Sequence, residues 1–418
     1  MAETIVIVGA GQAAASFISR HTRLGSEVEL HLIGEEPVPP YQRPPLSKNY
    51  LLGELERDRL FIRPPQWYAE QGITTDFGTR VESIERDTKQ IRTQNGDIIA
   101  YDKLLLCTGS TARKLPASLG GDLPGVFTLR SLADVDTMAP EFRAGRKLLI
   151  LGGGYIGLEA AASARKLGLN VTLLEMAERI LQRVAAPETS DFIRKLHQSN
   201  GVEIRESAGM KQLCQSHGRV VGAEMEDGEE LAADLVLVGI GASANTELAE
   251  QAGLDCDNGI PVNNICQTCD PDIYAAGDCT SFIRNGRRVR LESVQNAADQ
   301  GNFVAQILSG TDLQYDALPW FWSDQYDCKL QIAGLSTGYT STVVRPGATH
   351  ISQSTWYYAD DRLIAVDAMN DTSAYAFGRK IIAADKHPSP EEVADPNTDL
   401  KALANELISE LENPDPKF

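Results

Sequence analysis

A glycine-rich loop directly after an apolar run occurs twice in this chain. Residues 5–14 read IVIVGAGQAA, and residues 148–157 read LLILGGGYIG. In each copy a strand-like run, the glycine loop and a helix-like segment are followed by a second strand-like run, at residues 28–33 and 171–175. This order is typical of a βαβ unit in a parallel sheet. Because the two copies lie far apart, they predict two α/β domains rather than a short repeat.

Each glycine of the loop has its own physical reason. Gly152 makes the tight turn out of the strand, Gly154 lets a pyrophosphate approach the backbone, and Gly157 lets the helix pack close to the strand. The helix N-terminus then offers free N–H groups and a positive dipole end to the phosphates. In the first copy the same positions hold Gly9, Gly11 and Ala14. Ordinary turns would not need this context twice, so we expect two dinucleotide sites.

An acidic residue ends the second strand of each unit. Glu35 and Glu175 occupy these positions, where a carboxylate accepts hydrogen bonds from a ribose. A carboxylate at Glu175 would also repel a 2′-phosphate, which favours NADH over NADPH. A solvent-exposed glutamate is the alternative for either residue alone, but two at matched positions favour the binding role.

Composition excludes several classes of function. Acidic residues outnumber basic ones by 58 to 39, a net charge of −19, which argues against nucleic acid as a partner. No apolar stretch approaches the roughly 20 residues that span a bilayer, and the first strand begins too early to leave room for a targeting segment. The seven scattered cysteines indicate reduced thiols in the cytoplasm. Cys266 and Cys269 lack the second pair that a zinc site needs, so we expect two ordinary thiols.

The rest of the chain predicts how the domains are connected. Strand-like runs at 104–110 (LLLCTGS), 236–245 (VLVGIGASAN) and 273–278 (IYAAGD) can return the chain between two α/β domains. After Leu318 the sequence becomes aromatic and rich in β-branched residues, which indicates a third, α+β domain. We therefore expect one dinucleotide domain at 1–111 and 243–318, a second at 112–242, and a C-terminal interface domain at 319–418.

These motifs resemble a known family. GAG at 9–11, LLLCTG at 104–109, GGGYIGLE at 152–159 and IYAAGDC at 273–279 are similar to the flavoprotein reductases of the pyridine nucleotide-disulfide oxidoreductase superfamily. RPPLSK at 43–48, LESVQNA at 291–297 and PWFWSDQY at 319–326 narrow the resemblance to the ferredoxin reductases that serve bacterial oxygenases. The likeness covers nearly the whole chain.

The resemblance implies which residues contact each cofactor. For FAD they are Gly9, Gly11, Ala13, Ala14, Glu35, Lys48, Val81, Arg130, Asp278 and Val294. For NAD(H) they are Gly152, Gly154, Tyr155, Ile156, Gly157, Glu175, Ile240 and Gly241. Ala244 departs from the family, which often has proline there, and this mildly loosens the loop.

The resemblance also implies residues for electron transfer. Lys48 and Glu159 would form a pair beside the flavin, where the cation stabilises the reduced ring and the acid balances it when oxidised; two surface charges are the alternative. Trp320 and Trp322 are spaced to point the same way on a strand. Trp322 would shield the flavin from the docked ferredoxin, whereas for Trp320 a place in the domain core is equally well supported.

The expected activity is NADH-dependent reduction of a [2Fe–2S] ferredoxin that feeds a cytochrome P450 or ring-hydroxylating oxygenase. Residues 37–50 contain no cysteine pair, so electrons should leave the flavin without a disulfide relay. The four arginines of RNGRRVR at 284–290 could dock the acidic partner, or could be a solvated hairpin. An NADH oxidase or another small-acceptor reductase, and an NADH-sensing flavoprotein, remain as alternatives. We expect a monomer or a weak homodimer, and the sequence does not decide between them.

Overall fold

The computed structural model describes residues 3–25, 27–349 and 351–412. Its contacts divide the chain into two compact units, which are described separately below. The first unit comprises Met1–Pro45, Gly53–Thr111 and Ala242–Ala317. The second comprises Leu46–Leu52, Ala112–Gly241 and Leu318–Phe418. The short segment Leu46–Leu52, which carries Lys48, therefore packs with the second unit rather than with its neighbours in sequence.

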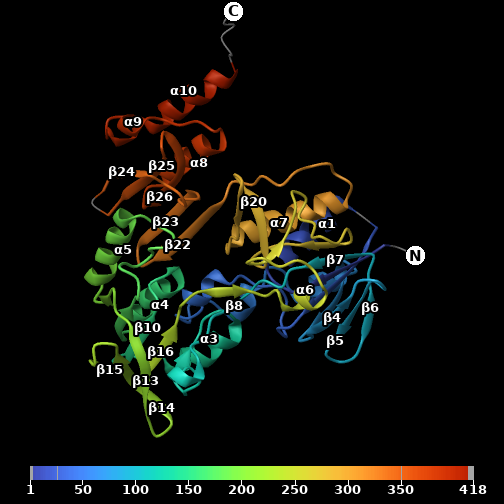
Figure 1. The fold of residues 1–418 in the computed structure, drawn as a ribbon, viewed down its shortest axis with the longest axis horizontal. Coiled ribbons are helices and arrows are strands. Elements are labelled where there is room, and N and C mark those ends of the chain that lie inside the picture. The colour runs from blue at the N-terminus through green and yellow to red at the C-terminus, as the bar shows by residue number, and fades with distance from the viewer. Residues whose placement is uncertain (1–2, 26, 350, 413–418) are drawn as a thin grey trace, which may run out of the picture. The chain divides into compact units, whose positions relative to one another are not determined.

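The first unit is built on a five-stranded parallel sheet (Figure 1). Its strand order is β19 (Ile273–Ala275), β7 (Lys103–Leu106), β1 (Thr4–Val8), β2 (Glu29–Gly34) and β3 (Thr74–Phe77). The central strands are buried on both faces, which explains why they read as continuous apolar runs.

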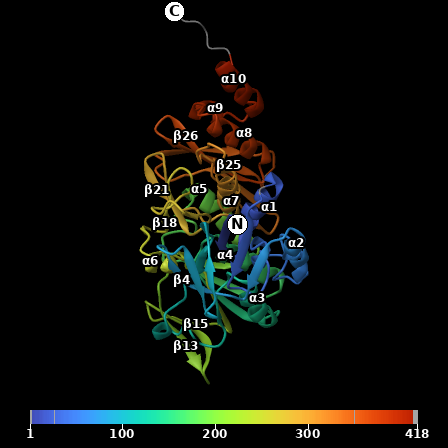
Figure 2. The same ribbon diagram turned by 90° about the vertical axis from the view of Figure 1, so that its right-hand side faces the viewer.

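Two helices of the first unit, α1 (Gln12–Leu24) and α7 (Val294–Leu308), lie side by side in both views (Figures 1 and 2). They approach so closely that a Cβ added at Gly301 would lie 2.2 Å from the carbonyl oxygen of Ala13. This contact fixes the first glycine loop against the segment that follows β19.

Smaller elements complete the first unit. One antiparallel sheet holds β4 (Val81–Glu85), β5 (Gln90–Thr93) and β6 (Ile98–Ala100). Another sheet holds β18 (Ile260–Pro261), β20 (Thr280–Arg284) and β21 (Arg287–Val289). The helices α2 (Pro65–Glu70) and α6 (Glu247–Gln251) lie between strands in the chain order, and β17 (Ala242–Ala244) begins the last segment.

The second unit contains a matching parallel sheet. Its order is β12 (Glu203–Arg205), β11 (Asn170–Leu174), β10 (Lys147–Leu151), β16 (Leu235–Val238) and β9 (Val126–Phe127). Helices α3 (Leu132–Met138), α4 (Tyr155–Lys166) and α5 (Pro187–Ser199) connect its strands. An antiparallel sheet of β13 (Met210–Ser216), β14 (Arg219–Met225) and β15 (Glu230–Ala232) projects from it (Figure 1).

The C-terminal part of the second unit is an antiparallel sheet covered by helices. The strand order is β22 (Trp320–Gln325), β23 (Cys328–Gly334), β26 (Arg362–Met369), β25 (Gln353–Ala359) and β24 (Ser341–Pro346). The helices α8 (Thr372–Ala383), α9 (Pro390–Ala394) and α10 (Leu400–Glu412) follow. Trp356 and Tyr358 are fully buried in the core between them. The expected fold class, two Rossmann-like sheets and a C-terminal α+β part, is confirmed.

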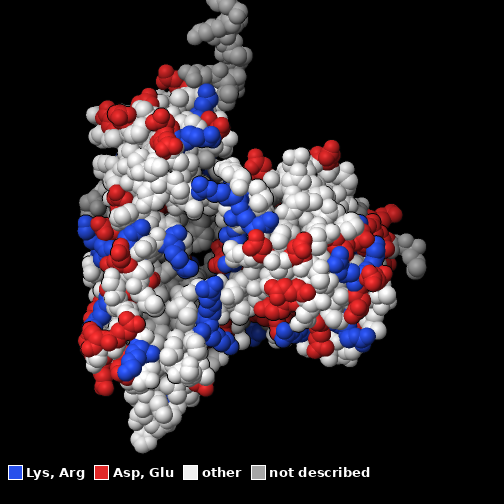
Figure 3. Space-filling model, in the orientation of Figure 1, with Lys and Arg blue, Asp and Glu red and all other residues white. Residues whose placement is uncertain are grey.

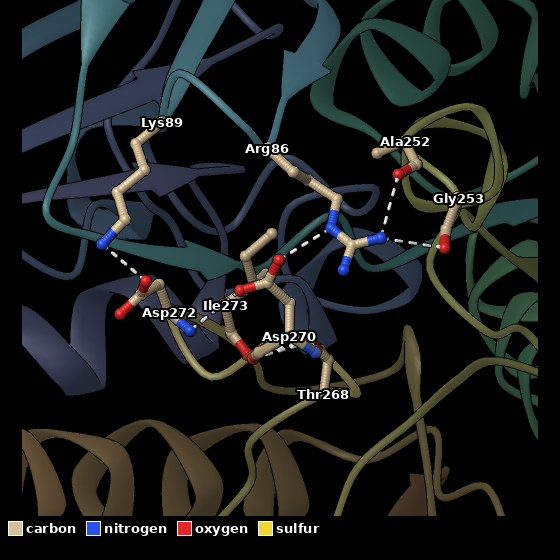
Figure 4. A network of polar contacts seen from close by, with 8 residues as sticks. All are labelled: Arg86, Lys89, Ala252, Gly253, Thr268, Asp270, Asp272 and Ile273. Atoms are coloured by element: carbon tan, nitrogen blue, oxygen red, sulfur yellow. Dashed lines mark hydrogen bonds and ion pairs between the residues drawn. The ribbon is translucent and has the colours of Figure 1, made fainter.

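A cluster of ion pairs fastens the loop that carries Cys266 and Cys269 (Figure 4). Arg86, just after β4, donates to Asp270 at 2.7 Å and to the carbonyl oxygen of Gly253. Asp272 pairs with Lys89 at 2.5 Å. These contacts join three separate segments of the first unit. They explain how the loop that carries Cys266 and Cys269 is held in place without a metal or a disulfide role for these cysteines.

Candidate functional site

The first glycine loop has the shape that a pyrophosphate needs. Gly9 has a φ of +105°, and a Cβ there would lie 2.2 Å from the carbonyl oxygen of Cys107, so only glycine fits. At Gly11, by contrast, a Cβ would meet no atom within 4 Å. The chain is therefore tight where it turns and open at the N-terminus of α1, where the phosphates of FAD would lie.

The second loop repeats this geometry within the second unit. Gly152 also has a φ of +105°, and its Cβ would lie 2.4 Å from the carbonyl oxygen of Gly239. A Cβ at Gly157 would lie 2.2 Å from the carbonyl oxygen of Gly152, which explains the close approach of α4 to the loop. Gly154, at the N-cap of α4, faces open space. Both loops thus fit a dinucleotide by the same test.

Glu175 is held in place by the backbone around the second loop. One carboxylate oxygen accepts from the N–H of Gly153 at 2.8 Å, and the other accepts from the N–H of Ala177 at 2.8 Å. The carboxylate is therefore fixed rather than mobile. Beside it Met176 is 78 % exposed, which leaves an apolar side chain uncovered next to the expected adenosine site. Glu35 is exposed after β2 in the first unit.

The first unit also contains polar residues that the sequence interpretation missed. Ser110 donates to Asp278 at 2.9 Å, so the Gly-Asp motif is linked to the end of the LLLCTGS segment. Arg43 donates to Glu36 at 2.6 Å and to the hydroxyl of Tyr41 at 2.8 Å. Burial acts to lower the pKa of Arg43, but the charges of Tyr41, Glu36 and Asp278 raise it overall. The RPPLSK motif could have pointed to Arg43, because Arg43 is the residue directly before its double proline.

Lys48 and Glu159 form a close ion pair within the second unit. The Lys48 Nζ lies 2.5 Å from Glu159 Oε2, and the Glu159 side chain is only 4 % exposed. Ser47 donates to the same oxygen at 2.5 Å, and Ser323 of β22 donates to Oε1 at 2.7 Å. A buried ion pair costs desolvation energy that surface charges would not. The structure therefore contradicts the alternative of two ordinary surface charges.

The aromatic residues of β22 divide between two faces of the strand. Trp320 and Trp322 lie on one face, with ring centroids 5.8 Å apart. Trp320 also contacts Tyr375, and the guanidinium of Arg379 lies 5.3 Å from its ring centroid. Trp320 packs against the C-terminal core, as one of its two interpretations expected. Phe321, on the opposite face, lies 4.7 Å from the Tyr155 ring at the start of α4.

The structure groups the other expected residues by unit. Those in the first unit are the buried Ala13, Ala14 and Val81 and the half-buried Val294 at the start of α7. Those in the second unit are Arg130, Ile156, Ile240 and Gly241. Arg130, which is expected at FAD, belongs to the second unit, as Lys48 does, and lies just before α3, where its N–H donates to Asp134. Ile156 and Ile240 are exposed apolar residues beside the second loop.

The cysteines differ in burial and in expected reactivity. All seven are free thiols. Burial raises the pKa of Cys266 to about 12, which keeps it protonated and unreactive, whereas Cys269 is exposed. Within the described ranges, no group of three or more His, Cys, Asp or Glu residues could hold a metal ion. Nor does a helix in that part of the chain have the length and apolar character to cross a membrane.

Two dinucleotide loops in one chain, each with an open position at a helix N-terminus, define an oxidoreductase that uses two dinucleotide cofactors. Residues 3–301 match the model of the pyridine nucleotide-disulphide oxidoreductases, and residues 320–404 match a reductase C-terminal domain. The chain belongs to the pyridine nucleotide-disulphide oxidoreductase family, whose members use FAD and NAD(H).

Individual relatives extend over nearly the whole chain. The ferredoxin reductase subunit of a 5,5′-dehydrodivanillate O-demethylase from a Sphingobium species is 40 % identical, covering 95 % of this chain and 97 % of its own. Putidaredoxin reductase CamA of Pseudomonas putida is 39 % identical, covering 98 % of both chains. A solved covalent complex of putidaredoxin reductase with putidaredoxin matches with a TM-score of 0.94 and 39 % identity, covering 97 % of this chain and 99 % of that chain.

Proposed function

We propose that this protein is an NADH-dependent, FAD-containing reductase that passes electrons singly to a [2Fe–2S] ferredoxin, which in turn feeds a cytochrome P450 or a related oxygenase. The observation that carries the proposal is the presence of two dinucleotide loops in a chain whose residues 37–50, expected beside the flavin, contain no cysteine pair. Electrons that enter as a hydride must then leave without a disulfide relay. A cytoplasmic location, suggested by the seven free thiols, belongs to the proposal.

The residues of each loop suggest how the cofactors would be held. Gly9 and Gly11 would let the FAD pyrophosphate approach α1. Asp278, oriented by Ser110, would face the ribityl and phosphate region of FAD. When bound, FAD would supply the ring that accepts a hydride and gives up electrons one at a time. Gly154 would admit the NADH pyrophosphate, and Glu175 would accept hydrogen bonds from its ribose.

Lys48, Glu159 and Trp322 are the residues that we propose for electron transfer. The ammonium group of Lys48 would offset negative charge on the reduced cofactor, and Glu159 would balance the ammonium group. Trp322 is half-buried, so part of its ring is available to cover a cofactor or a partner. The relatives at about 40 % identity include a ferredoxin reductase subunit, which supports the electron-transfer activity that these residues would serve.

The arginine-rich segment contributes less free charge than its sequence suggests. Basic side chains gather over β20 in Figure 3, but Arg284 pairs with Asp316, Arg288 with Asp257 and Arg290 with Glu292. For Arg287, the described part of the chain offers no acidic partner. We propose that Arg287 is the member of the segment that attracts an acidic ferredoxin.

The deciding experiment is NADH-driven reduction of cytochrome c with and without a [2Fe–2S] ferredoxin. We expect the rate to depend strongly on the ferredoxin, and NADH to be used in preference to NADPH. Equal rates in the two reactions would overturn the proposal. Rapid O₂ consumption without a partner would then indicate an NADH oxidase, and slow turnover with every acceptor would indicate a sensor.

A further inference from the structure

A line of buried side chains leads away from Glu159 within the second unit. Ser323 Oγ lies 2.7 Å from Glu159 Oε1, and Gln325 Nε2 lies 3.0 Å from Ser323 Oγ. Gln325 Oε1 in turn lies 2.7 Å from His197 Nε2. Ser323, Gln325 and His197 are each at most 1 % exposed. The line therefore joins α4, β22 and α5 away from water.

The chemistry of Glu159 fixes the direction of every hydrogen bond in this line. A carboxylate can only accept, so the single proton of the Ser323 hydroxyl must point to Glu159. The Ser323 oxygen is then left to accept, and the Gln325 amide nitrogen donates to it. The Gln325 carbonyl oxygen must therefore face α5, where it accepts from the N–H at Nε2 of His197. All donors point toward Glu159.

His197 ends the line as a neutral group. Burial lowers its pKa to about 4, although the hydrogen bond with Gln325 acts in the opposite direction. Its Nδ1 is buried and has no hydrogen-bond partner among the described residues, which agrees with a bare lone pair there. The Tyr326 ring lies edge-on to the imidazole at 5.1 Å and covers it. Because the amide of Gln325 does not pass protons readily, the line is suited to orienting charge rather than to carrying protons.

We propose that Ser323, Gln325 and His197 are positioning residues that keep the side chain of Glu159 turned toward Lys48, and thereby set how easily the bound flavin is reduced. The inference rests on the proposed role of the Lys48–Glu159 pair. Ser47, Lys48 and Ser323 all donate to this one buried carboxylate, and the Ser323 dipole offsets part of its negative charge. Without that dipole the site becomes more negative, which disfavours a reduced flavin that is itself anionic.

The test compares Ser323→Ala with Ser354→Ala in the FAD-containing protein. Ser354 lies in the same five-stranded sheet and is also fully buried, but its hydroxyl accepts from Trp356 instead. For Ser323→Ala we expect hydride transfer from NADH, followed by stopped flow, to slow by about tenfold. We also expect a more negative flavin midpoint potential and an unchanged dissociation constant for NADH. Ser354→Ala should change none of these, and Ser323→Thr, which keeps the hydroxyl, should restore the wild-type values.

A second variant keeps the test decisive if Ser323→Ala does not fold. Gln325→Leu removes the amide that donates to the Ser323 oxygen and so directs the Ser323 hydroxyl toward Glu159. A more negative flavin midpoint potential and slower hydride transfer are therefore expected for this variant as well. Independently of catalysis, ¹⁵N NMR of labelled histidine should show the neutral tautomer with the proton on Nε2 for the signal that His197→Gln removes. The inference would be overturned if both Ser323→Ala and Gln325→Leu kept the wild-type flavin potential and rate of hydride transfer. A proton on Nδ1 of His197 would overturn it as well. Because the potential is measured without ferredoxin, these outcomes stay distinct from a failure of the proposed function.

Discussion

Replacing Asp367 with asparagine should remove a large pH-dependent penalty from the stability of the second unit. Asp367 lies on β26 and is fully buried. The Tyr357 hydroxyl and the Thr189 hydroxyl both donate to its Oδ2, the latter at 2.9 Å. Burial nevertheless raises the pKa of Asp367 from 3.8 to about 7 against these bonds. The folded protein therefore binds a proton at Asp367 over a range in which the unfolded chain has lost it.

The sign and the size follow from this difference. A pKa raised by folding contributes stability that is full below pH 3.8 and is lost as the pH rises through 7. The full loss is about 4 kcal/mol, of which about 3 kcal/mol falls between pH 5 and pH 8. His197 acts in the opposite direction, because its pKa is lowered from 6.5 to about 4. Its contribution is present above pH 6.5 and falls by about 3 kcal/mol as the pH drops through 4.

The pH-dependent contributions of Asp367 and His197 to stability nearly cancel in the wild type. A variant that removes only one of the two groups is therefore needed to see either contribution. Urea unfolding from pH 5 to pH 8 can be followed by tryptophan fluorescence, since Trp320, Trp322 and Trp356 all belong to the second unit. The free energy of unfolding of Asp367→Asn, minus that of the wild type, should rise by about 3 kcal/mol over this range. Asp361→Asn, which changes an exposed carboxylate beside the same strand, should give a flat difference. A flat difference for Asp367→Asn as well would refute the reasoning.

Four further substitutions probe the proposed cofactor and partner sites. Glu175→Gln places an amide N–H₂ against one of two backbone N–H groups, so the KM for NADH should rise by roughly tenfold and the preference over NADPH should narrow in steady-state assays. Gly11→Ala should fold but retain less FAD per chain, as measured by absorbance, and a flavin content equal to that of the wild type would contradict this. Gly9→Ala should instead lower the yield of folded protein, because its Cβ would meet the carbonyl oxygen of Cys107. Arg287→Glu should raise the KM for ferredoxin at low salt and much less at high salt, and an effect independent of salt would exclude a charge role.

The parts of the fold that follow from local sequence were predicted well. The strands β1 and β10 begin and end where their apolar runs do, and the helices after both loops begin at the glycines. The reason is that the tight turn, the open helix N-terminus and the buried strand are all set by neighbouring residues. The sheet of β13–β15 and the sheet of β4–β6 were not predicted, because their short strands alternate weakly and are largely exposed.

The surroundings of Glu159 could not be predicted in the same way. Family resemblance paired Lys48 with Glu159, but Ser323, Gln325 and His197 come from a strand and a helix far along the chain. A buried serine or histidine has no signature in a single sequence. The free charge of the arginines of residues 284–290 was equally hidden, since their acidic partners Asp257 and Asp316 lie outside the segment.

The interleaving of the two units has a consequence for how the chain matures on the ribosome. All five strands of the second parallel sheet lie between Val126 and Val238, so that sheet can assemble as soon as this stretch has been made. The first sheet starts at Thr4 but must wait for its edge strand β19 at Ile273–Ala275. Until then β7 has an open edge, which is a template for wrong pairing. The usual order of N-terminal domain first is thus reversed for these sheets, and a pause in translation shortly before Ile273 would prolong the most aggregation-prone stage of synthesis.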